Sequence, residues 1–152
     1  MSLLEKHSDK VDTFVGVCHH LAAKQYVTGH GGNLAWKLED NVILITPTKH
    51  NKGDVNRDNV VFINLAGETI EGSVKPTGET PMYVNFFRER PDVQAVVHAH
   101  PKWSTFLSMV GADYLPVFAQ GSLVFPLPVL DTPNSINSVE MSDALNAVLS
   151  DR

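Results

Sequence analysis

The sequence of 152 residues contains one cysteine, Cys18, and no long hydrophobic run. A single cysteine excludes an intrachain disulfide framework, so we expect a reducing compartment and assign Cys18, within an apolar helical stretch, to the core. A membrane-spanning helix needs roughly 20 consecutive apolar residues, and none are present. The first residues also lack the charged-then-apolar order of a signal peptide. The protein is therefore predicted to be cytoplasmic.

Basic residues are sparse as well. The chain has 12 Lys and Arg against 17 Asp and Glu, which gives a formal net charge of −5. Without a basic run or an arginine-rich stripe, the sequence offers no electrostatic footprint for nucleic acid or for an anionic membrane. Small molecules are the expected partners. A hydrophobic fraction of 43% is enough for one globular domain with a core, so residues 1–152 are predicted to form a single domain.

Hydrophobic spacing predicts a mixed α/β chain. Helices are expected where apolar residues recur at helical spacing, over residues 8–26, 80–90, 101–110 and 138–149. Strands are expected over residues 34–38, 42–46, 60–65, 69–72, 93–98, 115–119 and 127–130. In the helix over 101–110, the side chains expected to face inward are Trp103, Phe106, Leu107 and Val110. Gly111 is expected to close that helix in a left-handed conformation.

A His-x-His pair, His98 and His100, follows the apolar run of residues 93–97. Side chains two apart in a strand lie on the same face, so both imidazoles can bind one cation. Imidazole is a common ligand of zinc. Upstream, Glu79 lies just before a predicted helix and could act as a third ligand or as a general base. The alternative is that the pair is structural, since the chain has seven histidines.

Two loops carry groups that suit an anion. The turn Gly29-His30-Gly31-Gly32-Asn33 can expose consecutive N–H groups because glycine adopts positive φ angles. Pro47-Thr48-Lys49-His50, after a predicted buried strand, adds hydroxyl and cationic donors. Each loop by itself is equally consistent with an ordinary turn, because neither has the spacing of a mononucleotide or dinucleotide fingerprint.

These segments together resemble the class II aldolase/adducin family over residues 9–152. The similar motifs are Gly-x-Gly-Gly-Asn, Ile-Thr-Pro-Thr, Lys-Pro-x-x-Glu and Arg-Pro-Asp-Val-x-Ala-Val-Val-His-x-His. The resemblance implies a three-layer α/β/α sandwich with a largely antiparallel central sheet. It also implies a zinc ion, or another divalent metal such as manganese or cobalt, and a homotetramer with sites at subunit interfaces.

Carried over by position, the resemblance makes Glu79 the catalytic acid/base and His98 and His100 metal ligands. The residues expected to hold a substrate phosphate are Gly32, Asn33, Thr48 and Thr77. The family's third histidine follows a helix similar to residues 138–149, and this sequence stops before it. We therefore expect the domain to be C-terminally incomplete.

Three positions depart from the family pattern within the expected substrate loops. His30 replaces a small hydroxyl residue, Lys49 replaces a glycine, and Gly78 replaces a serine. Since Lys49 is cationic and His30 can become so, the two residues are predicted to bind a substrate carboxylate instead of a phosphate.

The sequence thus predicts a metal-dependent carbon–carbon lyase, of aldolase or decarboxylase type, acting on a small hydroxy-carbonyl or sugar-acid substrate. In that hypothesis the metal stabilises an enediolate and Glu79 moves the proton. The alternative is a non-catalytic interaction module like the adducin head, which the missing third ligand favours.

Overall fold

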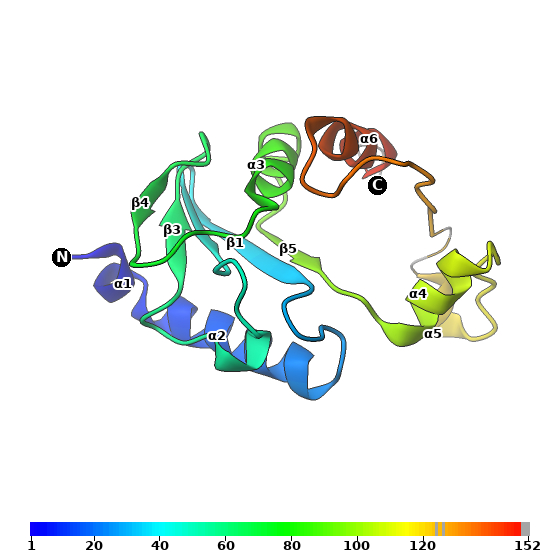
Figure 1. The fold of residues 1–152 in the computed structure, drawn as a ribbon, viewed down its shortest axis with the longest axis horizontal. Coiled ribbons are helices and arrows are strands. Elements are labelled where there is room, and N and C mark those ends of the chain that lie inside the picture. The colour runs from blue at the N-terminus through cyan, green and yellow to red at the C-terminus, as the bar shows by residue number, and fades with distance from the viewer. Residues whose placement is uncertain (124, 126, 150–152) are drawn as a thin grey trace.

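The computed structural model describes residues 1–123, 125 and 127–149, and its centre is a five-stranded sheet (Figure 1). The strand order is β4-β3-β2-β1-β5, and every neighbouring pair is antiparallel. The strands are β1 (Asn33–Glu39), β2 (Val42–Ile45), β3 (Val61–Ile63), β4 (Thr69–Glu71) and β5 (Ala95–His98). Each lies within a segment that the sequence predicts as a strand, give or take the terminal residues.

Helices cover both faces of this sheet. The helical elements are α1 (Leu3–Lys6), α2 (Ser8–Ala23), the 3-10 turn η1 (Lys52–Asp54), α3 (Thr80–Glu89), α4 (Lys102–Met109), α5 (Ala119–Ser122) and α6 (Val139–Leu149). In Figure 1, α2 lies below the sheet, whereas α3 lies above it with α6 alongside. The α/β fold with an antiparallel central sheet is therefore confirmed.

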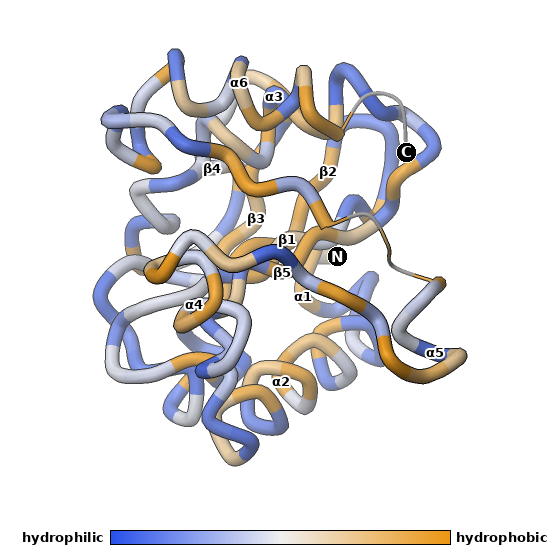
Figure 2. The backbone as a smooth tube through the Cα atoms, turned by 90° about the vertical axis from the view of Figure 1, so that its right-hand side faces the viewer, coloured by the Kyte–Doolittle hydropathy of each residue, from blue (hydrophilic) through white to orange (hydrophobic). Residues whose placement is uncertain are grey.

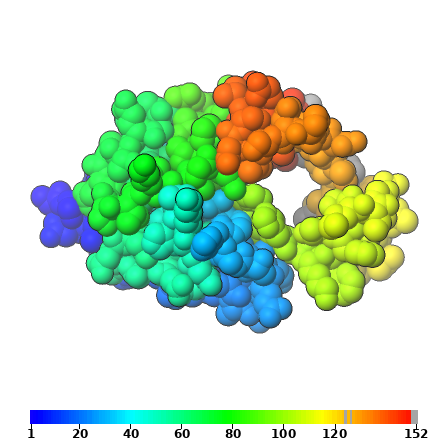
Figure 3. All heavy atoms as spheres, viewed as in Figure 1, coloured from blue at the N-terminus to red at the C-terminus, as the bar shows by residue number. Residues whose placement is uncertain are grey.

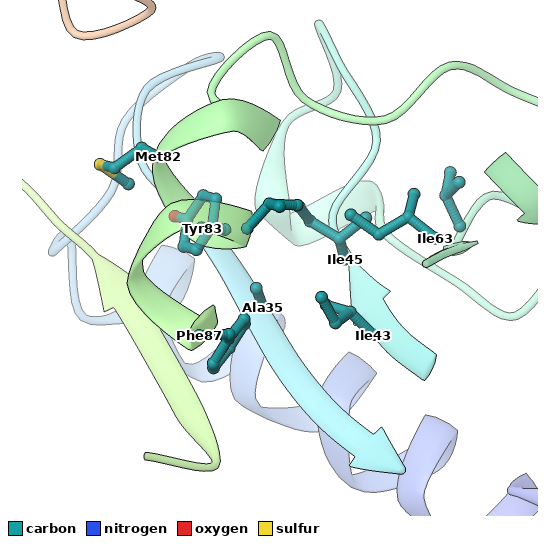
Figure 4. Packing of buried hydrophobic residues seen from close by; sticks show 9 residues of the cluster. Ala35, Ile43, Ile45, Ile63, Met82, Tyr83 and Phe87 are labelled. Carbon is teal, nitrogen blue, oxygen red and sulfur yellow. The ribbon is translucent and has the colours of Figure 1, made fainter. Parts of the chain in front are cut away.

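Alternation along the strands explains the two cores. Ile43, Ile45 and Ile63 project toward α3, where they pack with Tyr83 and Phe87 (Figure 4). The intervening residues project the other way and pack against α2: Leu34, Leu44 and Phe62 contact a cluster that includes Phe14 and Cys18. Successive strand residues face opposite sides, so these short apolar strands bury side chains on both faces of the sheet. The prediction that Cys18 is a core residue is confirmed.

The segment from α4 to residue 130 departs from prediction. Trp103, Phe106 and Val110 were expected to face inward, yet 69%, 52% and 56% of their surfaces are exposed. The prediction was wrong because helical spacing creates an apolar face without supplying an element to cover it. Gly111 does adopt the expected left-handed conformation, with φ +65°.

The two late strands also fail to form in the described residues. Residues 115–118 are irregular, Ala119 begins α5, and Leu127, Pro128, Val129 and Leu130 have no strand partner. A β-prone sequence needs a neighbouring strand edge to become a strand. In Figure 3 this segment, in yellow, stands apart from the sheet, and Figure 2 shows hydrophobic positions along it.

The last predicted helix forms as α6, and the Ser138 hydroxyl caps it by accepting a hydrogen bond from the N–H of Met141 at 3.1 Å. Within the described residues, no helix is long and apolar enough to cross a membrane.

Candidate metal and substrate site

His98 and His100 converge, although the two residues do not share a strand. β5 ends at His98, and His100 is held separately by its N–H, which donates to the carbonyl of Tyr26 at 2.7 Å. The two Nε2 atoms are 3.0 Å apart, and the ring centroids are 4.7 Å apart at an interplanar angle of 68°. Strand alternation is therefore not what aligns the pair. The predicted convergence of two imidazole nitrogens nevertheless holds.

Glu79 fixes the orientation of His98. It precedes α3 as the N-cap residue, and its Oε2 lies 2.6 Å from Nδ1 of His98. A carboxylate accepts, so this hydrogen bond requires the proton of His98 on Nδ1 and leaves a lone pair on Nε2. That lone pair faces His100. A carboxylate behind an imidazole is the usual way to orient a metal-binding histidine.

The protonation of the surrounding groups favours the same arrangement. Partial burial lowers the pKa of His100, which favours the neutral, metal-binding form of its ring. Tyr83 is fully buried one helical turn after Glu79. Burial, reinforced by the negative charge of Glu79, raises the pKa of Tyr83, so its phenol stays protonated.

The glycine-rich turn packs directly against the histidine pair. A Cβ at Gly32 would lie 2.4 Å from Val27 Cγ1 and 2.8 Å from the carbonyl of His98, and the residue has φ +70°. Glycine is therefore required at Gly32 by both space and backbone conformation. A Cβ at Gly31 would meet the ring of His100 at 3.2 Å. The turn thus forms one wall of the histidine site.

A second wall comes from two paired loops. The N–H of Thr48 donates to the carbonyl of Lys75 at 3.0 Å, and the N–H of Thr77 donates to the carbonyl of Thr46 at 3.0 Å. Thr46 also hydrogen-bonds Asn33 through its hydroxyl, at 3.4 Å. Because Asn33 is paired with His98 across β1 and β5, these contacts join the loops to the metal-binding candidates.

The predicted substrate residues fall into two groups. Asn33 and Thr77 are buried and hold the loops together, and the Thr77 hydroxyl accepts from the N–H of Glu79 at 3.3 Å. Those that reach the surface at least in part are His30, Thr48, Lys49 and Gly78. Lys49 has φ +57°, a left-handed conformation that glycine adopts without strain.

The structure does not assemble three metal ligands. Among the described residues no group of three or more His, Cys, Asp or Glu side chains is arranged to hold an ion. Glu79, one of the predicted ligands, lies at Nδ1 of His98, on the ring atom opposite the one that faces His100. His30 is not joined to the pair by any hydrogen bond in the described part of the chain, so it does not act as a substitute ligand here.

Sequence reasoning missed three residues of the site: Thr46, Lys52 and Tyr83. Tyr83 could have been found, because it is four residues after Glu79 and therefore on the same helical face. Lys52 gave no signal, since a lysine in a polar loop is ordinarily solvent-exposed.

Comparison with known proteins identifies the family of the chain. Residues 12–152 match the family described as Class II Aldolase and Adducin N-terminal domain. The chain belongs to this family. An L-fuculose phosphate aldolase of Methanococcus vannielii is 39% identical over 97 residues, covering 64% of this chain and 52% of that protein. A 3-oxo-tetronate 4-phosphate decarboxylase of Pectobacterium atrosepticum is 36% identical over 83 residues, covering 55% of this chain and 38% of that protein.

Solved class II aldolases support the fold. The l-fuculose-1-phosphate aldolase of Thermus thermophilus superposes with a TM-score of 0.77 at 22% identity, covering 92% of this chain and 70% of that one. The sugar-phosphate aldolase of Thermotoga maritima gives 0.74 at 19% identity, covering 97% and 79%. The chain spans about half the length of the curated relatives it matches, 52% and 59% for the first two.

Proposed function

We propose that the chain contributes to a metal-dependent carbon–carbon lyase of aldolase or decarboxylase type. The observation that carries this proposal is the array Glu79–His98–His100, in which a carboxylate orients one imidazole so that its Nε2 meets the Nε2 of a second at 3.0 Å. Two imidazole nitrogens with lone pairs that point at one position can bind the same divalent ion. Without an ion they can form a hydrogen bond to each other only if one of them carries a proton. The relatives named above as aldolases and a decarboxylase support the same reaction class.

His98 and His100 are the residues that would hold the ion, with zinc the first choice and manganese or cobalt the others. A catalytic zinc has about three protein ligands, so at least one ligand must come from outside the described pair. When bound, such an ion supplies Lewis-acid stabilisation of negative charge on the oxygens of a carbonyl substrate.

Glu79 is the residue proposed to move the proton. Its Oε2 is engaged by His98, whereas its Oε1 makes no hydrogen bond within the described residues. In an aldol cleavage Oε1 would take the proton from the substrate hydroxyl as the carbon–carbon bond breaks. The same carboxyl would then return that proton to the carbon that keeps the electron pair. A decarboxylation requires only the second transfer, and Glu79 would take that proton from solvent.

The substrate proposed is a small hydroxy-carbonyl compound that carries an anionic group. Gly32, Asn33, Thr48, Thr77 and Gly78 are the proposed substrate residues. The N–H groups of Thr48 and Thr77 already donate to carbonyls, so the hydroxyl of Thr48 and the N–H groups of the two glycines are the donors that suit a phosphate or a carboxylate. The exposed residues His30 and Lys49 favour the carboxylate, whereas the names of the relatives favour a phosphorylated sugar. We further propose a cytoplasmic homo-oligomer, of which a tetramer is the expected form.

Metal content tests the proposal. The purified full-length gene product is dialysed against limiting zinc, and bound zinc is measured by plasma mass spectrometry for wild type, His98→Ala, His100→Ala and the control His20→Ala. His20 is exposed on α2, away from the site. We expect near-stoichiometric zinc in the wild type and control, and little in the other two. Equal zinc in all four proteins would refute the assignment, and no zinc in any of them would favour the interaction module.

A further inference from the structure

Lys52 is a buried cation that the proposed reaction does not use. It lies in η1, has 0% of its surface exposed, and is among the largest fully buried side chains of the chain. A lysine is almost never fully buried unless its ammonium is paired, because removing the charge from water costs several kcal/mol. Its burial therefore calls for a compensating interaction.

The partners of this ammonium are the two loops of the site. Lys52 Nζ donates to the carbonyl of His50 at 2.8 Å and to the carbonyl of His30 at 3.3 Å. His30 belongs to the glycine-rich turn, and His50 follows Thr48 and Lys49 in the second loop. These loops are separate in sequence, and within the described residues Lys52 is the side chain that hydrogen-bonds the backbone of both.

The segment that carries Lys52 is itself fixed to α2. Nε2 of His19 lies 2.7 Å from the carbonyl of Val55, and Asn51 caps η1 by accepting from the N–H of Gly53 at 2.9 Å. Val55 is fully buried in the same cluster as Cys18. The ammonium therefore extends from a segment that is fixed to α2, and its hydrogen bonds fix the two loops to that segment.

No carboxylate neutralises this charge at close range. The ion pairs formed among the described residues do not include Lys52. Burial accordingly lowers its pKa, which the more distant negative charge of Glu79 opposes. A buried ammonium that has two carbonyl partners and no counter-ion raises the local potential beneath both loops.

We propose that Lys52 is a positioning residue that joins the two loops and supplies the buried positive charge for an oxyanion of the substrate. The inference rests on the proposed function for the site, and it goes further in assigning the charge to a residue beneath the loops. Because Lys52 is covered, the oxyanion contacts the loops themselves, and the ammonium acts through their placement and its field. The ligand class is a phosphoryl or a carboxylate group.

Anion binding to two substitutions tests the role. Lys52→Met removes the charge and the donors, whereas Lys52→Gln removes the charge and keeps N–H donors for the carbonyls. The control is Lys24→Met, an exposed lysine at the end of α2. Binding of inorganic phosphate and of acetate is measured by calorimetry, and zinc content is measured on the same samples.

We expect the wild type and Lys24→Met to prefer the same one of the two anions and to bind it with equal affinity. Lys52→Met and Lys52→Gln should bind it at least about tenfold more weakly, the factor produced by 1.4 kcal/mol of lost attraction. Preference for phosphate identifies a phosphoryl group, and preference for acetate identifies a carboxylate. Unchanged affinity in both Lys52 variants, or no binding of either anion by the wild type, would overturn the inference.

Zinc content separates the two proposals. If zinc is bound normally while the Lys52 variants keep full anion affinity, the inference fails and the lyase proposal stands. If zinc is absent while anion affinity still depends on Lys52, the lyase proposal fails and the anion site stands. Hydrogen exchange of the wild type covers the case in which neither variant folds. The anion should slow exchange in residues 29–33 and 48–51 together, and protection of one loop alone would contradict a joint role.

Discussion

The sheet with α2 and α3 differs sharply from the segment that contains α4 and α5. Both regions are rich in apolar side chains, yet Phe62 in β3 is 1% exposed, whereas Phe106 in α4 is 52% exposed and Met109 is 79% exposed. The strands of the first region have a helix on each face, and the second region has no such cover in the described residues. Both regions have the same apolar pattern, so the burial of a side chain depends on whether the fold places another helix or strand against it.

The site follows the same division. Its loops and its histidine pair lie at the ends of β1, β2 and β5 and at the start of α3, which are elements of the well-packed region. A site held by packed strands and a helix is more precise than one held by a free loop. The array of Glu79, His98 and His100 should therefore depend on the sheet and be insensitive to changes in α4.

The largest expected effect is the loss of proton transfer in Glu79→Gln. Glutamine cannot accept a proton, so turnover should fall about 100- to 10,000-fold. The Michaelis constant should change little, because Glu79 is proposed to act in the transition state rather than to bind the substrate. The measurement is the steady-state turnover of an anionic hydroxy-carbonyl substrate that the wild-type enzyme cleaves.

Phe106→Ala, on the exposed face of α4, is the matched control for that assay. If activity depends only on residues of the sheet, α2 and α3, Phe106→Ala should retain turnover close to wild type. Comparable losses of turnover in the two variants would show that activity also depends on α4. Unchanged turnover in Glu79→Gln would show that Glu79 does not transfer the proton.

Stability provides the second contrast. Phe62→Ala should lower the free energy of unfolding by about 3–5 kcal/mol, because it removes a buried ring and leaves a cavity between the sheet and α2. Phe106→Ala should change the free energy of unfolding by no more than about 0.5 kcal/mol, as is usual for exposed positions. Urea titration followed by circular dichroism measures both values. A large loss in Phe106→Ala would show that α4 is covered in solution by a surface outside the described contacts.

Sequence predicted the well-packed region far better than the exposed one. Alternation and helical spacing predicted the five strands, α2, α3 and α6, because in these elements the local pattern and the tertiary partner agree. The same rules failed for the strands over 115–119 and 127–130, where no described strand edge is available. The His-x-His spacing and the position of Glu79 before a helix identified these three residues, and the resemblance to the family assigned their roles. The structure brings Glu79 into contact with His98, and His98 into contact with His100.

The details of the site depended on tertiary contacts that no local pattern encodes. The hydrogen bond between Glu79 and Nδ1 of His98 joins residues 19 apart in sequence. His100 is aligned by the carbonyl of Tyr26 rather than by strand geometry. Lys52 is buried where its segment η1 packs on α2 and its ammonium reaches the carbonyls of both loops. Each of these features requires two segments to be placed before its chemistry can be seen.

The smallest expected effect tests whether the second loop stores strain at Lys49. This residue has φ +57°, and His50 stabilises the turn with Nδ1 2.8 Å from the carbonyl of Thr48. A non-glycine residue in the left-handed region costs roughly 1 kcal/mol, and glycine avoids that cost while losing about 0.4–1 kcal/mol through the greater freedom of the unfolded chain. Lys49→Gly should therefore leave the free energy of unfolding unchanged or raise it by up to about 0.6 kcal/mol.

Lys24→Gly is the matched control, because φ at Lys24 is −83° and glycine there has no strain to relieve. It should lower the free energy of unfolding by about 0.5–1 kcal/mol. Equal destabilisation of both variants in urea titrations would show that Lys49 contributes a contact worth more than its strain, and a parallel loss of acetate binding in Lys49→Gly would identify that contact as the anion.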